Sequence, residues 1–180
     1  MIDEKELLIQ LQDKRTREQA FTMLMTQYQE SVYWQIRRMV TNHEDADDIL
    51  QNTFLKIWNS VDAFQGRSQL RTWIYRIAVN ETLSFLEKRK KEVVLNEDDA
   101  SVVADVLDGD PYFDGDETEQ LLQEAVRRLP DKQRMVFHMK YFDEMKYEEI
   151  SQILGTTVGA LKASYHHAVK KICAYFEQND

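Results

Sequence analysis

The chain has 180 residues, of which 43% are hydrophobic and 11% aromatic, and its formal net charge at pH 7 is −9. This apolar content is enough for one ordinary domain or two small ones. The single Cys173 excludes a disulfide framework and a cysteine-based zinc site. The start, MIDEKELL, lacks the regions of a signal peptide, and no stretch approaches the roughly 20 apolar residues that cross a bilayer. We therefore expect a cytoplasmic protein without direct membrane contact.

The negative charge is concentrated in one segment. Residues 92–119 hold eleven of the 32 acidic residues and no Lys or Arg, which leaves 21 acids against 23 bases elsewhere. The segment contains Gly109, Pro111 and Gly115 and shows no sustained helical or alternating period. We interpret it as an acidic flexible linker, which is either a solvated tether or, through its short apolar clusters, a segment that docks in one state.

Helical periodicity predicts about four helices before the linker. Apolar residues at helical spacing run from Leu7 to Leu11 and then from Ala20 to Val40. The third helix carries TNHEDADDILQNTF (41–54) and presents an apolar stripe at i, i+3, i+4 and i+7 on one face. The fourth follows the loop 64–69, runs from about Leu70 to Lys91 and ends in a basic run, which suits the helix dipole.

Helical segments also follow the linker. A short amphipathic helix from Leu121 to Leu129 stops at Pro130, which suits the start of the next helix. Two further apolar-periodic segments are joined at Gly155–Thr157, where a glycine ends one helix and a threonine caps the next. This pattern is typical of a helix-turn-helix, although bundles that touch no DNA also use glycine corners. The expected fold class is all-α, with two small helical domains and a C-terminal helix-turn-helix.

The acidic residues in segment 43–48 raise the question of a metal or catalytic site. Ligands must converge on one point, whereas the adjacent Asp47 and Asp48 would point about 100° apart on a helix. Glu44 and Asp48 could share a face at i, i+4 but would supply only two carboxylates. No second cluster of His, Asp and Glu completes a shell in the sequence, so a metal site is the weaker interpretation.

The start of a helix explains part of this segment better. Asn42 is placed to cap the helix, Asp45 stands at the third helical position of an arrangement like a capping box, and acids in the first turn are each stabilised by about 0.3 to 1 kcal/mol. A polar ridge continues beyond this turn and consists of Asp47, Asp48, Gln51 and Asn52. The ridge is either solvated or docks against a partner rich in arginine.

Three segments together resemble the extracytoplasmic-function (ECF) RNA polymerase sigma factors of the sigma-70 family. They are DADDILQNTF, SQLRTWIYRIAVN and the stretch from RRLP to VGALK. The resemblance extends from about residue 20 to residue 175, and the linker matches only in position and character. It implies a non-enzymatic transcription initiation factor that binds core RNA polymerase, recognises the promoter minus 10 and minus 35 elements and assists promoter melting.

The resemblance also implies a division of labour. Residues 1–91 would be the region 2-like domain that binds the polymerase β′ clamp and the minus 10 element, 92–119 the linker, and 120–180 the region 4-like domain that binds the minus 35 element and the β flap. The implied polymerase-binding residues are Asp47, Asp48, Gln51 and Asn52. An anti-sigma factor is a further partner that members of this group commonly have, and no cofactor is implied.

In the first domain, the resemblance assigns base capture and melting to the loop 64–69 and the helix after it. Single-strand recognition uses a cationic groove with pockets for extruded bases. The candidate minus 10 residues are Arg67, Ser68, Gln69, Arg71, Thr72, Tyr75, Arg76, Asn80 and Lys88. Trp73 could stack on a base, but its place on the apolar stripe favours the core. The basic run 88–91 either contacts phosphates or forms a solvated helix end.

In the second domain, the helix that begins near Thr157 would be the recognition helix, whose N-terminal residues enter the major groove. The candidate minus 35 residues are Thr156, Thr157, Val158, Gly159, Ala160, Lys162, Ala163, Ser164, His166 and His167. The residues expected in the core are Leu161, Ala168 and Ile172. Where many members of the group carry arginines, this chain has Ser164 and His167, so base readout should depend less on bidentate Arg–guanine contacts.

Two other functions make different predictions. A regulator that acts alone through its helix-turn-helix would bind duplex DNA tightly without polymerase, whereas a sigma factor should bind promoter DNA poorly until it is assembled. A metal-dependent hydrolase that uses residues 43–48 would contain a divalent metal and would lose activity in Asp48→Ala.

Overall fold

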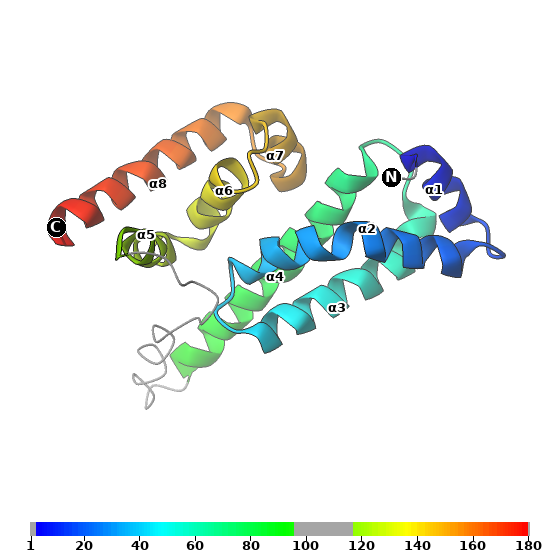
Figure 1. Cartoon of the computed structure of the whole chain (residues 1–180), viewed down its shortest axis with the longest axis horizontal. Helices are drawn as coiled ribbons and strands as arrows, with labels where there is room; N and C mark the ends of the chain where they lie inside the picture. The colour runs from blue at the N-terminus through cyan, green and yellow to red at the C-terminus, as the bar shows by residue number, and fades with distance from the viewer. Residues whose placement is uncertain (1–2, 96–116, 180) are drawn as a thin grey trace. The chain divides into compact units, whose positions relative to one another are not determined.

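The computed structural model describes residues 3–95 and 117–179. Within these ranges every regular element is helical, so the predicted all-α fold is confirmed. The chain divides into two compact units, Met1–Lys88 and Arg89–Asp180, and each is described by itself (Figure 1). Among the described residues, no helix combines the length and the apolar character needed to cross a membrane.

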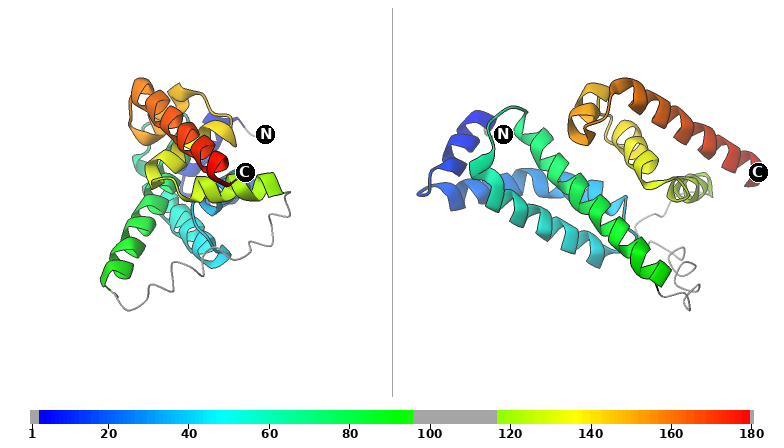
Figure 2. Two further views of the ribbon diagram at one scale, coloured as in Figure 1. Left: turned by 90° about the vertical axis from the view of Figure 1, so that its left-hand side faces the viewer. Right: turned by 180° about the vertical axis from the view of Figure 1, so that it is seen from behind.

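The described part of the first unit contains four α-helices, as the sequence predicted, and the last of them continues past Lys88. They are α1 (Glu4–Gln12), α2 (Arg17–Arg37), α3 (His43–Ser60), with the short 3-10 helix η1 (Val61–Ala63) after it, and α4 (Leu70–Leu95). The helices α2 and α3 lie side by side, and α1 packs against α2 and η1 (Figures 1 and 2).

The apolar stripes predicted from spacing form the core of this unit. The side chains of Leu7, Leu24, Ile36, Ile57 and Ile74, one or more from each of the four helices, are at most 1% exposed. Complete burial of an aliphatic side chain of this size stabilises the fold by about 1.5 to 3 kcal/mol. The four helices are therefore held together mainly by their apolar faces, which leaves their other faces available for contacts outside the unit.

The helices on both sides of the linker are longer than the sequence predicted. Helix α4 continues past Lys91 to Leu95, and α5 begins at Glu117, so residues 92–95 and 117–119 of the expected linker are helical. Neither segment contains Gly or Pro, and the acids in the first turn of α5 interact favourably with the helix dipole. The rest of the expected linker lies outside the described residues.

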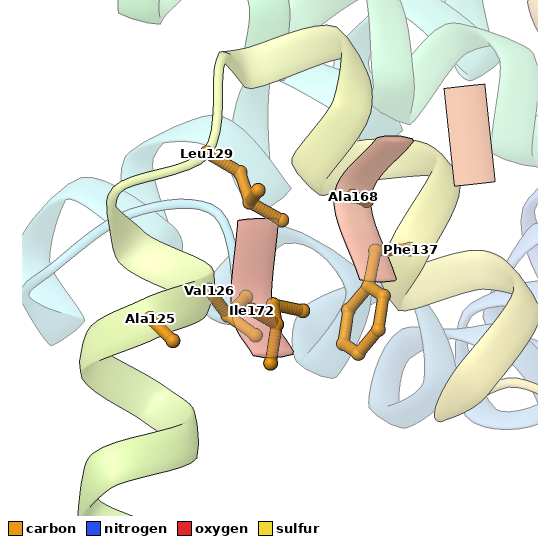
Figure 3. Packing of buried hydrophobic residues seen from close by; sticks show 6 residues of the cluster. All are labelled: Ala125, Val126, Leu129, Phe137, Ala168 and Ile172. Atoms are coloured by element: carbon orange, nitrogen blue, oxygen red, sulfur yellow. The ribbon is translucent and has the colours of Figure 1, made fainter. Parts of the chain in front are cut away.

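The second unit consists of α5 (Glu117–Arg127), α6 (Asp131–Tyr141), α7 (Tyr147–Leu154) and α8 (Val158–Asn179). Helix α8 packs against each of the other three. Buried side chains of α5, α6, α8 and the turn after α5 point toward one another (Figure 3) and comprise Ala125, Val126, Leu129, Phe137, Ala168 and Ile172. Leu161 is buried as well, so the three core positions predicted for the last helix are confirmed.

The corner between α7 and α8 has the geometry that the sequence predicted. Gly155 ends α7 in the left-handed conformation, with φ 63° and ψ 30°. The hydroxyl of Thr157 accepts a hydrogen bond from the backbone N–H of Ala160 at 3.3 Å and caps α8. The helix-turn-helix is therefore present, and its turn is fixed by one glycine and one cap.

Two glycine substitutions should have opposite effects on stability. A Cβ at Gly155 or at Gly159 would meet no heavy atom within 4 Å, but only Gly155 has a positive φ. Gly155→Ala should lower the free energy of unfolding by about 1 kcal/mol because of backbone strain. Gly159→Ala, within a helix, should raise it by about 0.5 to 1 kcal/mol. Urea denaturation followed by circular dichroism measures both, and an unchanged stability in Gly155→Ala would contradict the assignment of strain to the corner.

Candidate functional site

Helix α3 separates a buried side from a polar side. Its side chains Ala46, Ile49, Phe54 and Ile57 are buried in the core. The members of the polar ridge are all exposed: Asp47, Asp48, Gln51 and Asn52. Because the buried side holds the helix in place, these four polar groups are presented on a rigid surface, which we call the α3 ridge.

The start of α3 confirms the capping interpretation of the acidic segment. The side-chain oxygen of Asn42 accepts a hydrogen bond from the backbone N–H of Asp45 at 2.7 Å. The Nδ1 atom of His43 lies 2.6 Å from the hydroxyl of Tyr33 on α2. No group of three or more His, Cys, Asp or Glu side chains in the described part of the chain is placed to hold a metal ion.

Leu55, on the same side of α3, was not predicted from the sequence. Its side chain is 53% exposed. Leu55 follows Asp48 by seven residues and Gln51 by four, which is the spacing that places three helical residues on one face. The same spacing could have identified Leu55 from the sequence, because it places Leu55 with the polar ridge and outside the apolar stripe of Phe54 and Ile57. The α3 ridge therefore has an apolar side chain beside it.

The predicted minus 10 residues differ in exposure. The exposed ones are Arg67, Gln69, Arg71, Arg76, Asn80 and Lys88, and Ser68 is half-buried. Thr72 and Tyr75, by contrast, are only 5% and 3% exposed, because α4 turns them toward the core with Ile74. The exposed members can contact a strand directly, whereas Thr72 and Tyr75 can act only through the residues that they support. Tyr75 supports Arg71 in this way, because the Arg71 guanidinium lies 5.3 Å from the centroid of the Tyr75 ring.

Trp73 is half-buried next to the loop 64–69. Its ring centroid lies 4.9 Å from that of Phe64, which is buried. This contact agrees with the expectation that Trp73 belongs mainly to the core. It also joins the first turn of α4 to the beginning of the loop.

A pocket of about 310 Å³ is lined by side chains of α3 and α4. Its lining residues are Lys56, Asn59, Ser60, Ile77, Asn80 and Glu81. An ion pair between Lys56 and Glu81 connects the two helices. Of these residues, only Asn80 was predicted from the sequence as a site residue. The others become its neighbours because α3 packs against α4. The lining thus combines one apolar side chain, two amides, a hydroxyl and this ion pair.

The predicted recognition residues on α8 and the turn before it are largely accessible. Those exposed are Thr156, Thr157, Gly159, Ala160, Lys162, Ala163, His166 and His167, and those half-buried are Val158 and Ser164. No acidic residue occurs in α8 before Glu177, while Lys162 and Lys170 are exposed. The face therefore carries positive charge and small side chains together, which suits close approach to a phosphate backbone.

Aromatic contacts hold the first half of α8 in position. The ring of Tyr165 stacks on Phe137 at 5.8 Å and meets the edge of Tyr147 at 6.5 Å. Burial raises the pKa of Tyr165, in agreement with a role in packing. The ammonium groups of Lys162 and Lys140 lie 5.8 Å and 5.1 Å from the ring centroid of Tyr147. Tyr147 therefore orients Lys162 beside the helix-turn-helix.

Comparisons with known proteins identify the family. Residues 24–92 match the family model of sigma-70 region 2, and residues 119–172 match that of sigma-70 region 4. The ECF RNA polymerase sigma factor SigW of Bacillus subtilis (strain 168) is 31% identical over 86% of this chain and 88% of its own length. The chain belongs to the ECF group of the sigma-70 family. It is a sigma factor of transcription initiation, as the sequence motifs indicated.

Other relatives agree with this assignment. The ECF RNA polymerase sigma-E factor of Escherichia coli (strain K12) is 27% identical, over 86% of this sigma factor and 85% of that relative. The structure of CnrH in complex with the cytosolic domain of CnrY has a TM-score of 0.70 at 20% identity and covers 98% of this chain and 99% of its own. The sigma factor RpoE in complex with the anti-sigma factor NepR from Bartonella quintana also has a TM-score of 0.70, at 24% identity, over 87% and 96%. These structures share the helical fold.

The cap and the surface of α3 should respond differently to truncation. Asn42→Ala removes the acceptor for the Asp45 N–H and should lower the free energy of unfolding by about 1 kcal/mol. Asn52→Ala shortens an exposed side chain and should change it by less than about 0.5 kcal/mol. Chemical denaturation of the full chain measures both values. Equal losses would show that the α3 ridge also serves the fold.

Proposed function

We propose that this sigma factor binds the β′ clamp of core RNA polymerase through the α3 ridge. The observation that carries this proposal is the exposure of four adjacent hydrogen-bonding side chains on a helix whose other side is buried, within the match to region 2. Carboxylates and amides in such a row suit a partner helix rich in arginine, and Leu55 adds apolar area. Catalysis remains in the polymerase, and the sigma factor itself is not an enzyme.

The proposed domains are 1–91 for the polymerase and the minus 10 element, 92–119 for the linker, and 120–180 for the minus 35 element and the β flap. The two family matches, to residues 24–92 and 119–172, support this division. Because core RNA polymerase is the partner, we place the protein in the cytoplasm. We also propose an anti-sigma factor as a partner, since RpoE, which shares this fold, was solved with one.

For the minus 10 element, we propose capture of an unpaired base by the loop 64–69 and the neighbouring part of α4. The pocket that Asn80 shares with Ile77 offers amide and apolar groups to an extruded base. The exposed Arg67, Arg71 and Arg76 can contact the phosphates on either side of such a base. Base capture and phosphate contact together favour the melted strand over the duplex.

For the minus 35 element, we propose that α8 enters the major groove with the residues near its N-terminus. The absence of acids before Glu177, together with small Gly159 and Ala160, supports close approach to DNA. Lys162 is the basic side chain nearest the start of this helix. His167 is exposed at a position where many members of the group have an arginine, and His166 beside it is exposed as well, so both are proposed to contribute to base readout.

In vitro transcription with core RNA polymerase tests the whole proposal. Addition of the protein should create start sites that core polymerase alone does not use, at promoters that share minus 10 and minus 35 elements. A helix-turn-helix regulator that acts alone would instead bind duplex DNA tightly without polymerase. Failure to add any start site would overturn the proposed function.

A charge reversal on the α3 ridge should impair assembly with polymerase. Asp48→Arg should weaken core polymerase binding by at least about tenfold, because a carboxylate that faces a basic partner becomes a repulsive cation. Glu30→Arg makes the same change at an exposed position of α2 and serves as the matched control. Fluorescence titration with core polymerase measures the affinity, and circular dichroism checks the fold. A loss of similar size in both variants would contradict a specific role for the α3 ridge.

Removal of one basic side chain from α8 should change the salt dependence of promoter binding. Lys162→Ala should reduce the slope of log Kobs against log salt for holoenzyme by about 0.9, the value for one phosphate contact. Arg128→Ala is the control, because Arg128 lies 4.8 Å from the ring of Tyr175, near the other end of α8. Filter binding at several salt concentrations measures both slopes. An unchanged slope in Lys162→Ala would exclude it from the phosphate contacts.

A further inference from the structure

Helix α1 is joined to both ends of the loop 64–69 although it lies before residue 24, where the match to region 2 begins. At the beginning of the loop, the side-chain amide of Gln12 donates a hydrogen bond to the carbonyl oxygen of Phe64 at 3.3 Å. Just after its end, the carboxylate of Glu4 accepts a hydrogen bond from the backbone N–H of Arg71 at 3.0 Å. Each end of α1 is therefore hydrogen-bonded to the backbone at one end of the loop.

The position of α1 does not depend on these two hydrogen bonds. Leu7 and Leu11 anchor the helix in the core, where they are 1% and 0% exposed. The turn after α1 is fixed by the hydroxyl of Thr16, which donates to the carbonyl oxygen of Gln10 at 2.8 Å. Because the helix is held by its apolar side, Gln12 and Glu4 can act as fixed points for the loop.

The contact at Glu4 has a clear electrostatic reason. The N–H of Arg71 belongs to the first turn of α4, where backbone donors lack partners within the helix and the dipole favours a negative charge. The Glu4 carboxylate supplies both an acceptor and a charge. Burial raises the pKa of the nearby Tyr28, and the charge on Glu4 adds to this increase. The Glu4 carboxylate thus lies close to groups of both α2 and α4.

The middle of the loop, beyond the buried Phe64, is exposed. Gln65, Gly66, Arg67 and Gln69 are exposed, and Gly66 adopts a positive φ of 66°. A loop that must become ordered when it binds a ligand loses affinity, and fixing its ends beforehand reduces that loss. Preorganisation also sharpens discrimination, because a wrong base cannot be accommodated by a change in the loop.

We propose that α1 holds the base-capture loop 64–69 in its binding conformation and that Glu4 and Gln12 are positioning residues for minus 10 recognition. The proposal rests on the proposed function of the loop 64–69 as the site of base capture. Neither residue needs to touch DNA. Each one acts through the backbone at one end of the loop, Gln12 through Phe64 and Glu4 through Arg71.

The test uses holoenzyme and fluorescent single-stranded oligonucleotides. One oligonucleotide carries the minus 10 sequence found by mapping start sites, and the others each differ from it at one base. The double variant Glu4→Ala, Gln12→Ala lacks both side-chain contacts to the loop. Its ratio of affinities for the matched and the changed oligonucleotides should fall by about fivefold or more. A fivefold change corresponds to about the net contribution of one hydrogen bond. Glu4→Gln combined with wild-type Gln12 should keep most of the discrimination, because the amide oxygen can still accept from Arg71.

The control variant is Glu6→Ala, which removes an exposed carboxylate from the same helix without a contact to the loop. It should discriminate as wild type does. A double variant that discriminates as well as wild type would refute the proposed positioning role of α1. A double variant in which core polymerase binding falls in parallel with discrimination would also refute it, because general unfolding would then explain the result. If wild-type holoenzyme itself fails to discriminate, the proposed base capture is wrong.

Discussion

Burial of one side of each amphipathic helix is the constraint on which the functional surfaces depend. In α3, Ala46 and Ile57 are completely buried, while Asp48 and Gln51 of the same helix are exposed. A helix turns by about 100° per residue, so both sets follow from one pattern of apolar and polar residues. The core therefore determines which side chains this sigma factor can offer to a partner.

Helix α8 uses the same arrangement for a different purpose. Leu161 and Ala168 hold it against the other helices of its unit, and Lys162 and His166 lie on its accessible side. The residues proposed to contact the minus 35 element are thus carried by a rigid helix, whereas Arg67 and Gln69, proposed to contact the minus 10 element, lie in the loop before α4. The proposed support for this loop comes from α1, through its hydrogen bonds to the backbone of Phe64 and Arg71.

Several features of the candidate site could not be predicted from local patterns. The ion pair of the pocket joins Lys56 to Glu81, and the hydrogen bonds of α1 reach 52 and 67 residues along the chain. Residue type alone also mispredicted exposure. Tyr75 was predicted to contact the minus 10 element, but its side chain faces the core. Polar residues beside a loop do not reveal which of them the next helix turns inward.

The sequence by itself determined the helices, the glycine corner at Gly155 and the caps at Asn42 and Thr157, because each depends on residues within about four positions of one another. It also determined the family, through motifs spread over both domains. Only the tertiary structure decided the pocket, the burial of Thr72 and the hydrogen bonds between α1 and the two ends of the loop. These features depend on which helix faces meet, and periodicity describes the faces of a helix without naming the partner of each one.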